Sequence, residues 1–150
     1  IIINKGGSKV IKLILKLESK EIDKPYILNS NFLFNDELVE ILNNVFDVYI
    51  ADIKFWKNQC ASNIAKTKIY RNIVKNNIKK IQSNNPMIIR HLPLQDHFNC
   101  CTKPIIDWLK SIPDQTDIII SFLPSLYSNN DNQLEKAYEY AHSQNMSTIG

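Results

Sequence analysis

The chain has 150 residues, enough for one domain that buries roughly 70% of its unfolded surface without disulfides. With 44% hydrophobic and 22% charged residues, the composition excludes a disordered or fibrous protein. A formal net charge of +3 is too small, and the lysines too dispersed among glutamates and asparagines, to favour a nucleic-acid partner.

No apolar run approaches the roughly 20 residues that cross a bilayer, so we expect no membrane association. The first residues show no secretory signal, and because they form a strand-like run without an initiator methionine, we expect the natural protein to begin upstream. The three cysteines are an odd number and two are adjacent, which favours the cytoplasm or another reducing compartment.

Short β-type runs alternate with segments of helical period along the whole chain. Strands are predicted at residues 1–3, 26–28, 48–53, 87–92 and 118–123. Helices are predicted from Ser8, at 36–45 behind an Asn35 cap, around 69–81, at 102–109 and at 132–142. Residues 55–66 are predicted to be irregular or weakly helical.

Five β-α repeats imply parallel strands joined by right-handed crossovers. We therefore predict an α/β fold, a partial (β/α) barrel whose strands are neighbours in sequence order and whose helices lie on one face. No linker interrupts the pattern, so residues 1–150 are expected to form one domain.

Polar residues follow each of the first four strands, and in a parallel sheet these strand ends share one edge. The residues are Gly6, Gly7, Asn29, Ser30, Asn31, Asp52, Lys54, Arg90 and His91. We predict that Asn29, Asn31, Asp52, Lys54 and Arg90 approach one another on the side away from the helices. In a regular strand His91 points the opposite way from Arg90, toward the helices.

Taken together, these residues resemble one family, the radical S-adenosylmethionine (SAM) proteins, in the subgroup similar to pyruvate formate-lyase activating enzymes. Gly6-Gly7 matches the start of the Gly-Gly-Glu-Pro motif, and Asp52-Ile53-Lys54 matches Asp-x-Lys. The remaining matches are Asn29-Ser30-Asn31, Cys60-Ala61, Arg90-His91-Leu92-x-Leu94, His97 and Cys100-Cys101-Thr102-Lys103-Pro104. They cover most of residues 4–145.

The resemblance implies a 4Fe–4S cluster, SAM as cosubstrate, radical oxidoreductase chemistry and, in activating enzymes, a protein substrate. It implies SAM-site roles for Gly6, Gly7, Asn29, Ser30, Asn31, Asp52, Lys54, Arg90 and His91. No catalytic residue is assigned. The missing upstream part or a protein substrate is the partner it suggests.

Two departures weigh against an intact site. The Cys-x3-Cys-x2-Cys run that holds the cluster is not in this chain, so we predict that the chain alone cannot bind a cluster. Ser8-Lys9 stands in place of Glu-Pro, and Pro124-Ser125-Leu126-Tyr127 in place of Gln-Tyr-x-Pro. A degenerate, cofactor-free scaffold or interaction subunit is therefore an alternative, and a flavodoxin-like domain is a third hypothesis.

Several of these residues also have purely structural interpretations. Gly6-Gly7 suits a strand-to-helix turn, Asp52 and Lys54 a surface ion pair, and Arg90 a cation paired with Asp52 that could still bind a ligand carboxylate. His97 and Cys100-Cys101 are expected to lie in a loop and helix start, and the sulfurs of Cys60, Cys100 and Cys101 are expected to pack as small hydrophobes. Adjacent cysteines lack the spaced pairs of zinc motifs, so no metal ligand is predicted.

Overall fold

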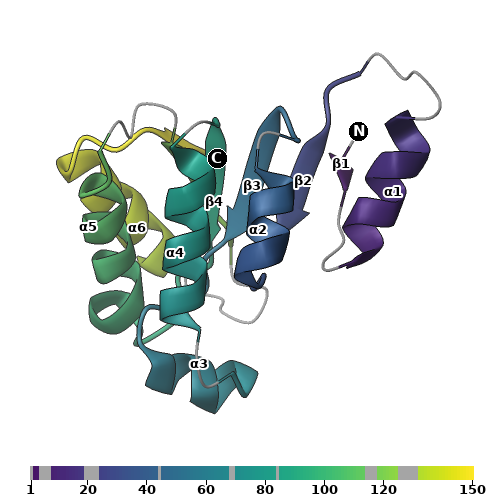
Figure 1. Ribbon diagram of the computed structural model, residues 1–150. Helices are drawn as coiled ribbons and strands as arrows, with labels where there is room; N and C mark the ends of the chain where they lie inside the picture. The colour runs from purple at the N-terminus through teal and green to yellow at the C-terminus, as the bar shows by residue number, and fades with distance from the viewer. Residues whose placement is uncertain are drawn as a thin grey trace.

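The computed structural model describes residues 2–3, 8–18, 24–43, 45–67, 70–83, 85–113, 118–124 and 132–150. Six strands form one sheet: β1 (Ile2–Ile3), β2 (Ile27–Ser30), β3 (Val48–Asp52), β4 (Met87–His91), β5 (Ile118–Phe122) and β6 (Thr148–Ile149). The helices are α1 (Ser8–Glu18), α2 (Asp36–Leu42), α3 (Asn58–Ala65), α4 (Arg71–Gln82), α5 (Lys103–Lys110) and α6 (Asn132–Ser143), and a π-helical turn, η1 (Phe98–Thr102), leads into α5 (Figure 1).

The strands are parallel and neighbour one another in sequence order, β1-β2-β3-β4-β5-β6. This confirms the predicted α/β class, the parallel pairing and the order of the five predicted strands. The sequence analysis missed β6, which adds two residues beside β5. Because β1 and β6 stand at opposite ends of the strand order, the described sheet is open, as a partial barrel requires.

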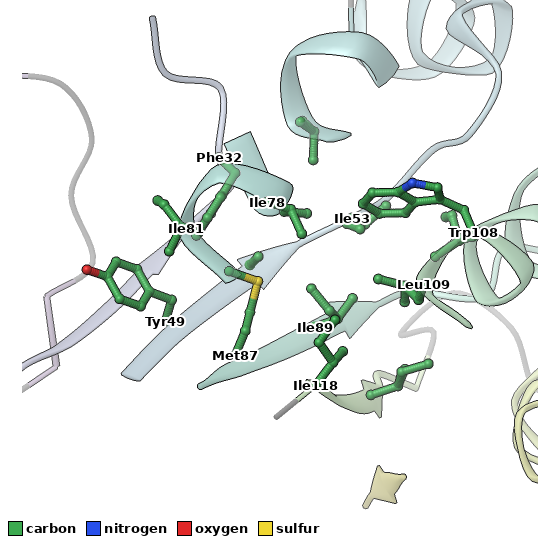
Figure 2. Close-up of a cluster of buried hydrophobic side chains, with 14 of the residues drawn as sticks. Phe32, Tyr49, Ile53, Ile78, Ile81, Met87, Ile89, Trp108, Leu109 and Ile118 are labelled. Carbon is green, nitrogen blue, oxygen red and sulfur yellow. The ribbon is translucent and has the colours of Figure 1, made fainter. Parts of the chain in front are cut away.

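Side chains alternate along the central strands between a buried face and a half-exposed face. The buried face carries Leu28, Tyr49, Ala51, Met87, Ile89, Ile118 and Ile120, none more than 1% exposed. These side chains pack against apolar residues of the helices, among them Ile78 and Ile81 of α4 and Leu109 of α5 (Figure 2). The continuous core under the helices fixes the register, because a shift by one residue would turn these side chains to the other face.

The helices that the structure describes do not cover the opposite face. Its side chains are the half-exposed Ile27, Val48, Ile50, Ile88 and Ile119, with polar residues toward the carboxyl ends of the strands. Figure 1 shows α2 and α4 in front of the strands, on the covered side. The candidate site therefore has an apolar floor and a polar edge.

Asn35 caps α2 as predicted, because its Oδ1 accepts a hydrogen bond from the Leu38 amide at 3.1 Å. Residues 55–66, predicted to be irregular or weakly helical, contain α3, in which only Ala61 is buried. Leu15 of α1 is 61% exposed. In the part of the chain that the structure describes, we find no helix whose length and apolar character would let it cross a membrane.

Candidate functional site

Asp52 and Arg90 form an ion pair on the open face, where β3 and β4 end. The two residues are register partners, so their side chains leave the sheet on the same side. Arg90 Nε donates to Asp52 Oδ1 at 2.7 Å, and Arg90 Nη2 lies 2.6 Å from the same oxygen. The Asp52 side chain is 15% exposed and that of Arg90 29%, so the pair is partly shielded from water. The predicted approach of these two residues is confirmed.

Lys54 and Asn29 flank this pair. Lys54 Nζ lies 3.8 Å from Asp52 Oδ2, the carboxylate oxygen that Arg90 does not contact, and its side chain is 49% exposed. Asn29 is the register partner of Ile50, two residues before Asp52, and so points to the same face one strand away. Ser121 of β5 continues the polar edge beside Arg90.

The loop after β2 is held by its own polar side chains. Ser30 Oγ accepts from the Phe32 amide at 3.3 Å, and Asn31 Oδ1 accepts from the Leu33 amide at 3.2 Å. Phe32 is fully buried with a φ of 56°, in the left-handed region that a bulky residue rarely occupies. Asn77 of α4 secures this turn, since its Nδ2 donates to the carbonyls of Phe32 and Phe34, both at 2.9 Å. Ser30 and Asn31 therefore shape the loop.

His91 lies on the helix side of the sheet, 1% exposed. Its Nδ1 lies 2.7 Å from the Ile53 carbonyl and its Nε2 lies 3.0 Å from Thr102 Oγ1. Burial lowers the pKa of His91 to about 4, so the ring is neutral at physiological pH. Both nitrogens are used inside the core, and the ring faces away from Arg90. His91 therefore does not face the polar edge that Asp52 and Arg90 form.

Tyr70, at the start of α4, was not singled out from the sequence. Its hydroxyl donates to the Asp52 carbonyl at 3.2 Å and accepts from the Lys54 amide at 2.9 Å. Burial raises the pKa of Tyr70 to about 12, which keeps the hydroxyl protonated as a donor. Tyr70 thus fixes the backbone at the end of β3. No sequence motif marks it, because the two elements that it joins meet only in the folded chain.

Gly6 and Gly7 lie outside the described residues, as do 125–127 of the segment that departs from Gln-Tyr-x-Pro. The structure therefore places neither motif. A hollow of about 400 Å³ lies between α1 and α2, lined by Ile11, Leu33, Phe34, Asn35, Glu37, Leu38 and Ile41. Its lining does not include Asp52 or Arg90, so it is separate from the polar edge.

A second polar cluster joins the segments that follow β3 and β4. It consists of Cys60, His97, Cys100 and Cys101, whose ligand atoms all lie within 4.8 Å of one another. Burial, and then the neighbouring Cys101 and Cys100 thiols, raise the pKa of Cys60 to about 12. The structure thus brings together four side chains that could ligate one ion, whereas the sequence predicted only that the cysteines pack as small hydrophobes.

This cluster does not fit a 4Fe–4S group. The thiolates that hold such a cluster bind different iron atoms, so they lie farther apart than the ligands of a single ion. Cys60, Cys100 and Cys101 are all the cysteines of the chain, and their sulfurs lie too close together for that arrangement.

A comparison with solved structures supports the fold. A crystal structure of a domain of pyruvate-formate lyase-activating enzyme from Bacteroides vulgatus superposes with a TM-score of 0.80 and 14% sequence identity, covering 99% of this chain and 96% of that one. An uncharacterized protein of Methanocaldococcus jannaschii is 34% identical over 120 residues, which are 78% of this chain and 35% of the relative. The chain thus spans about a third of the length of this curated relative. No protein-family model matches the chain.

The fold and the polar edge define a class: an open, parallel α/β sheet with helices on one face and charged groups at the carboxyl ends of its strands. Within that class, the chain has the fold of a domain of a pyruvate-formate lyase-activating enzyme.

Proposed function

We propose that this chain is the carboxyl-terminal part of the core domain of a radical SAM protein, and that its open sheet face lines the SAM site. The proposal joins the ordered motif matches with the fold that the chain shares with an activating-enzyme domain. The observation that carries it is the Asp52–Arg90 pair, which lies on the uncovered face at the carboxyl edge where α/β folds bind ligands.

Arg90 is the residue that recognises the cosubstrate. Two of its nitrogens, Nε and Nη2, contact Asp52 Oδ1, and no hydrogen bond from its other amino group occurs among the described residues. A guanidinium fork can serve a second acceptor, so Arg90 can hold a ligand carboxylate while Asp52 fixes its orientation. Ile50 and Ile88, half-exposed beside the pair, supply apolar surface for the rest of the ligand.

SAM cleavage at a 4Fe–4S cluster supplies the radical in this family, and a cluster site has to come from outside this chain. The chain's own residues orient and partly desolvate the cosubstrate. The affinity of this chain alone for SAM is therefore expected to be weak.

Equilibrium dialysis of the purified chain against tritiated SAM tests the proposal. We expect weak, saturable binding that falls on the order of tenfold in Arg90→Gln, a loss equivalent to about 1.4 kcal/mol. Lys80→Gln is the matched control, because it removes another cation paired with a carboxylate, Asp36, on the helix side. Equal SAM binding by the unaltered chain, Arg90→Gln and Lys80→Gln would contradict the proposal, and so would the absence of saturable binding at millimolar SAM.

A second candidate function is a cofactor-free scaffold or interaction subunit. Ser8-Lys9 in place of the expected Glu-Pro removes the acidic group that the resemblance places on the methionine amine. The half-exposed isoleucines of the open face would then pack against protein. Iron content and SAM cleavage, measured on the full-length protein purified anaerobically, separate the two candidates: both are expected of the radical SAM protein and neither of the scaffold.

A further inference from the structure

We propose that Cys60, His97, Cys100 and Cys101 form a structural zinc site that ties the segment after β3 to the segment after β4. Their ligand atoms, three sulfurs and one nitrogen, all lie within 4.8 Å of one another. This inference does not rest on the proposed function, because the four residues bind zinc in either candidate protein.

The spacing of the last three residues explains how one ion can reach them. His97, Cys100 and Cys101 stand at positions i, i+3 and i+4, which share one face of a helix. The chain there is helical: the Cys101 amide donates to the His97 carbonyl at 2.8 Å and the Thr102 amide to the same oxygen at 3.3 Å. Two adjacent cysteines can therefore serve one ion, with Cys60 of α3 completing the set across 40 residues of sequence.

The separations suit tetrahedral zinc. With Zn–S bonds of about 2.3 Å, tetrahedral geometry places two sulfurs about 3.8 Å apart. Cys60 Sγ lies 3.9 Å from Cys100 Sγ, and His97 Nδ1 lies 3.3 Å from Cys100 Sγ. Three cysteines and one histidine are a known ligand set of structural zinc. Ligand atoms this close need little movement to close on an ion.

The surroundings of Cys101 suit a metal ligand in a closed site. The Trp56 amide donates to Cys101 Sγ at 3.4 Å, the kind of outer hydrogen bond that orients metal ligands. Cys101 is 1% exposed and the other three residues are half-buried, which leaves little room for a water ligand. A closed, sulfur-rich site of this kind is structural.

An ion at this site would stabilise the short helix α3. Helix α3 has eight residues and buries only Ala61 against the core. A helix this short is marginal without tertiary contacts. A bond from Cys60 to a shared ion would hold α3 against η1 and would fix the chain that follows Asp52 of the polar edge.

Zinc content of the purified reduced chain, measured by mass spectrometry, is the first test. We expect about one zinc ion per chain, lost in Cys60→Ser and in His97→Gln. Cys101→Ser could fail to fold, because it places a hydroxyl at a buried position. His97→Gln avoids this problem, because His97 is only half-buried. His142→Gln is the matched control, since His142 is exposed and outside the cluster, and it should keep its zinc.

Cobalt substitution and a chelator provide the second readout. Co²⁺ should show thiolate-to-metal charge transfer and the intense visible bands of a tetrahedral ion, and zinc removal should lower Tm and expose α3 to protease. A reduced chain purified without zinc whose Tm does not change when zinc is added would overturn the inference, as would weak octahedral cobalt bands. A Cys60–Cys100 disulfide in the anaerobically purified chain would overturn it too.

Discussion

Arg90 and Asp52 face each other across β4 and β3, with Arg90 Nη2 2.6 Å from Asp52 Oδ1, on the side of the sheet that the helices leave uncovered. The pair is shielded by its neighbours but remains open to a ligand. It links the stability of the sheet edge to the proposed recognition of SAM.

Asp52→Asn should lower the free energy of unfolding by about 1–3 kcal/mol, because a partly buried guanidinium loses its charged acceptor. Urea unfolding at neutral pH measures the change. Asp36→Asn breaks the Lys80–Asp36 pair, whose aspartate is 80% exposed, and should lower the free energy of unfolding much less. Equal losses in the two variants would show that the Asp52 pair is an ordinary surface contact.

His91 should make stability depend on pH. Its pKa falls from 6.5 to about 4 on folding because of burial, so between these values the unfolded chain binds more protons. The contribution of His91 to stability should therefore be constant above about pH 7 and decrease as pH falls from 6.5 to 4, by about 3 kcal/mol in total. Urea unfolding at a series of pH values measures this slope.

The matched variants for that experiment are His91→Gln and His142→Gln. The first lowers stability at every pH, because the contacts to Ile53 and Thr102 change, but it should remove this part of the slope. The second changes an exposed histidine and should leave the slope intact. An unchanged slope in His91→Gln would assign the pH dependence to other groups.

Asn77→Ala should destabilise the loop after β2 by about 2–3 kcal/mol, because the carbonyls of Phe32 and Phe34 lose their donor. Hydrogen exchange should rise most at residues 31–34. Asn72→Ala, at an exposed position of the same helix, is the control and should change stability by less than about 0.5 kcal/mol. A uniform rise in hydrogen exchange along the whole Asn77→Ala chain would contradict a local role of Asn77 in this loop.

Anaerobic reconstitution of the chain with iron and sulfide should leave no 4Fe–4S cluster, because the three thiols converge on one point. Iron content and visible absorption measure the result. A stoichiometric, cysteine-dependent cluster would contradict both this prediction and the assignment of the thiols to zinc.

The sequence was sufficient for the parallel sheet because the apolar runs predicted as strands at 48–53, 87–92 and 118–123 are separated by segments of helical period. It missed β6, since two residues carry no periodic signal and depend on pairing with β5. Strand alternation correctly separated Arg90 from His91, because a period of two needs no knowledge of the partner strands.

The thiol cluster shows where spacing arguments fail. Cys60 reaches Cys100 only because β3 and β4 are neighbours, a contact between residues 40 apart in sequence. The i, i+3, i+4 spacing of His97, Cys100 and Cys101 was visible in the sequence, but it indicates a shared face only if this segment is helical. A search for two spaced cysteine pairs does not detect a group of this kind.

The most direct test of the proposed function is an NMR titration of the isotope-labelled chain with SAM. The account predicts that chemical-shift changes concentrate at Asn29, Asp52, Lys54 and Arg90, at the carboxyl ends of β2, β3 and β4, and that they disappear in Arg90→Gln. Changes confined to the hollow between α1 and α2, or no change at millimolar SAM, would contradict it.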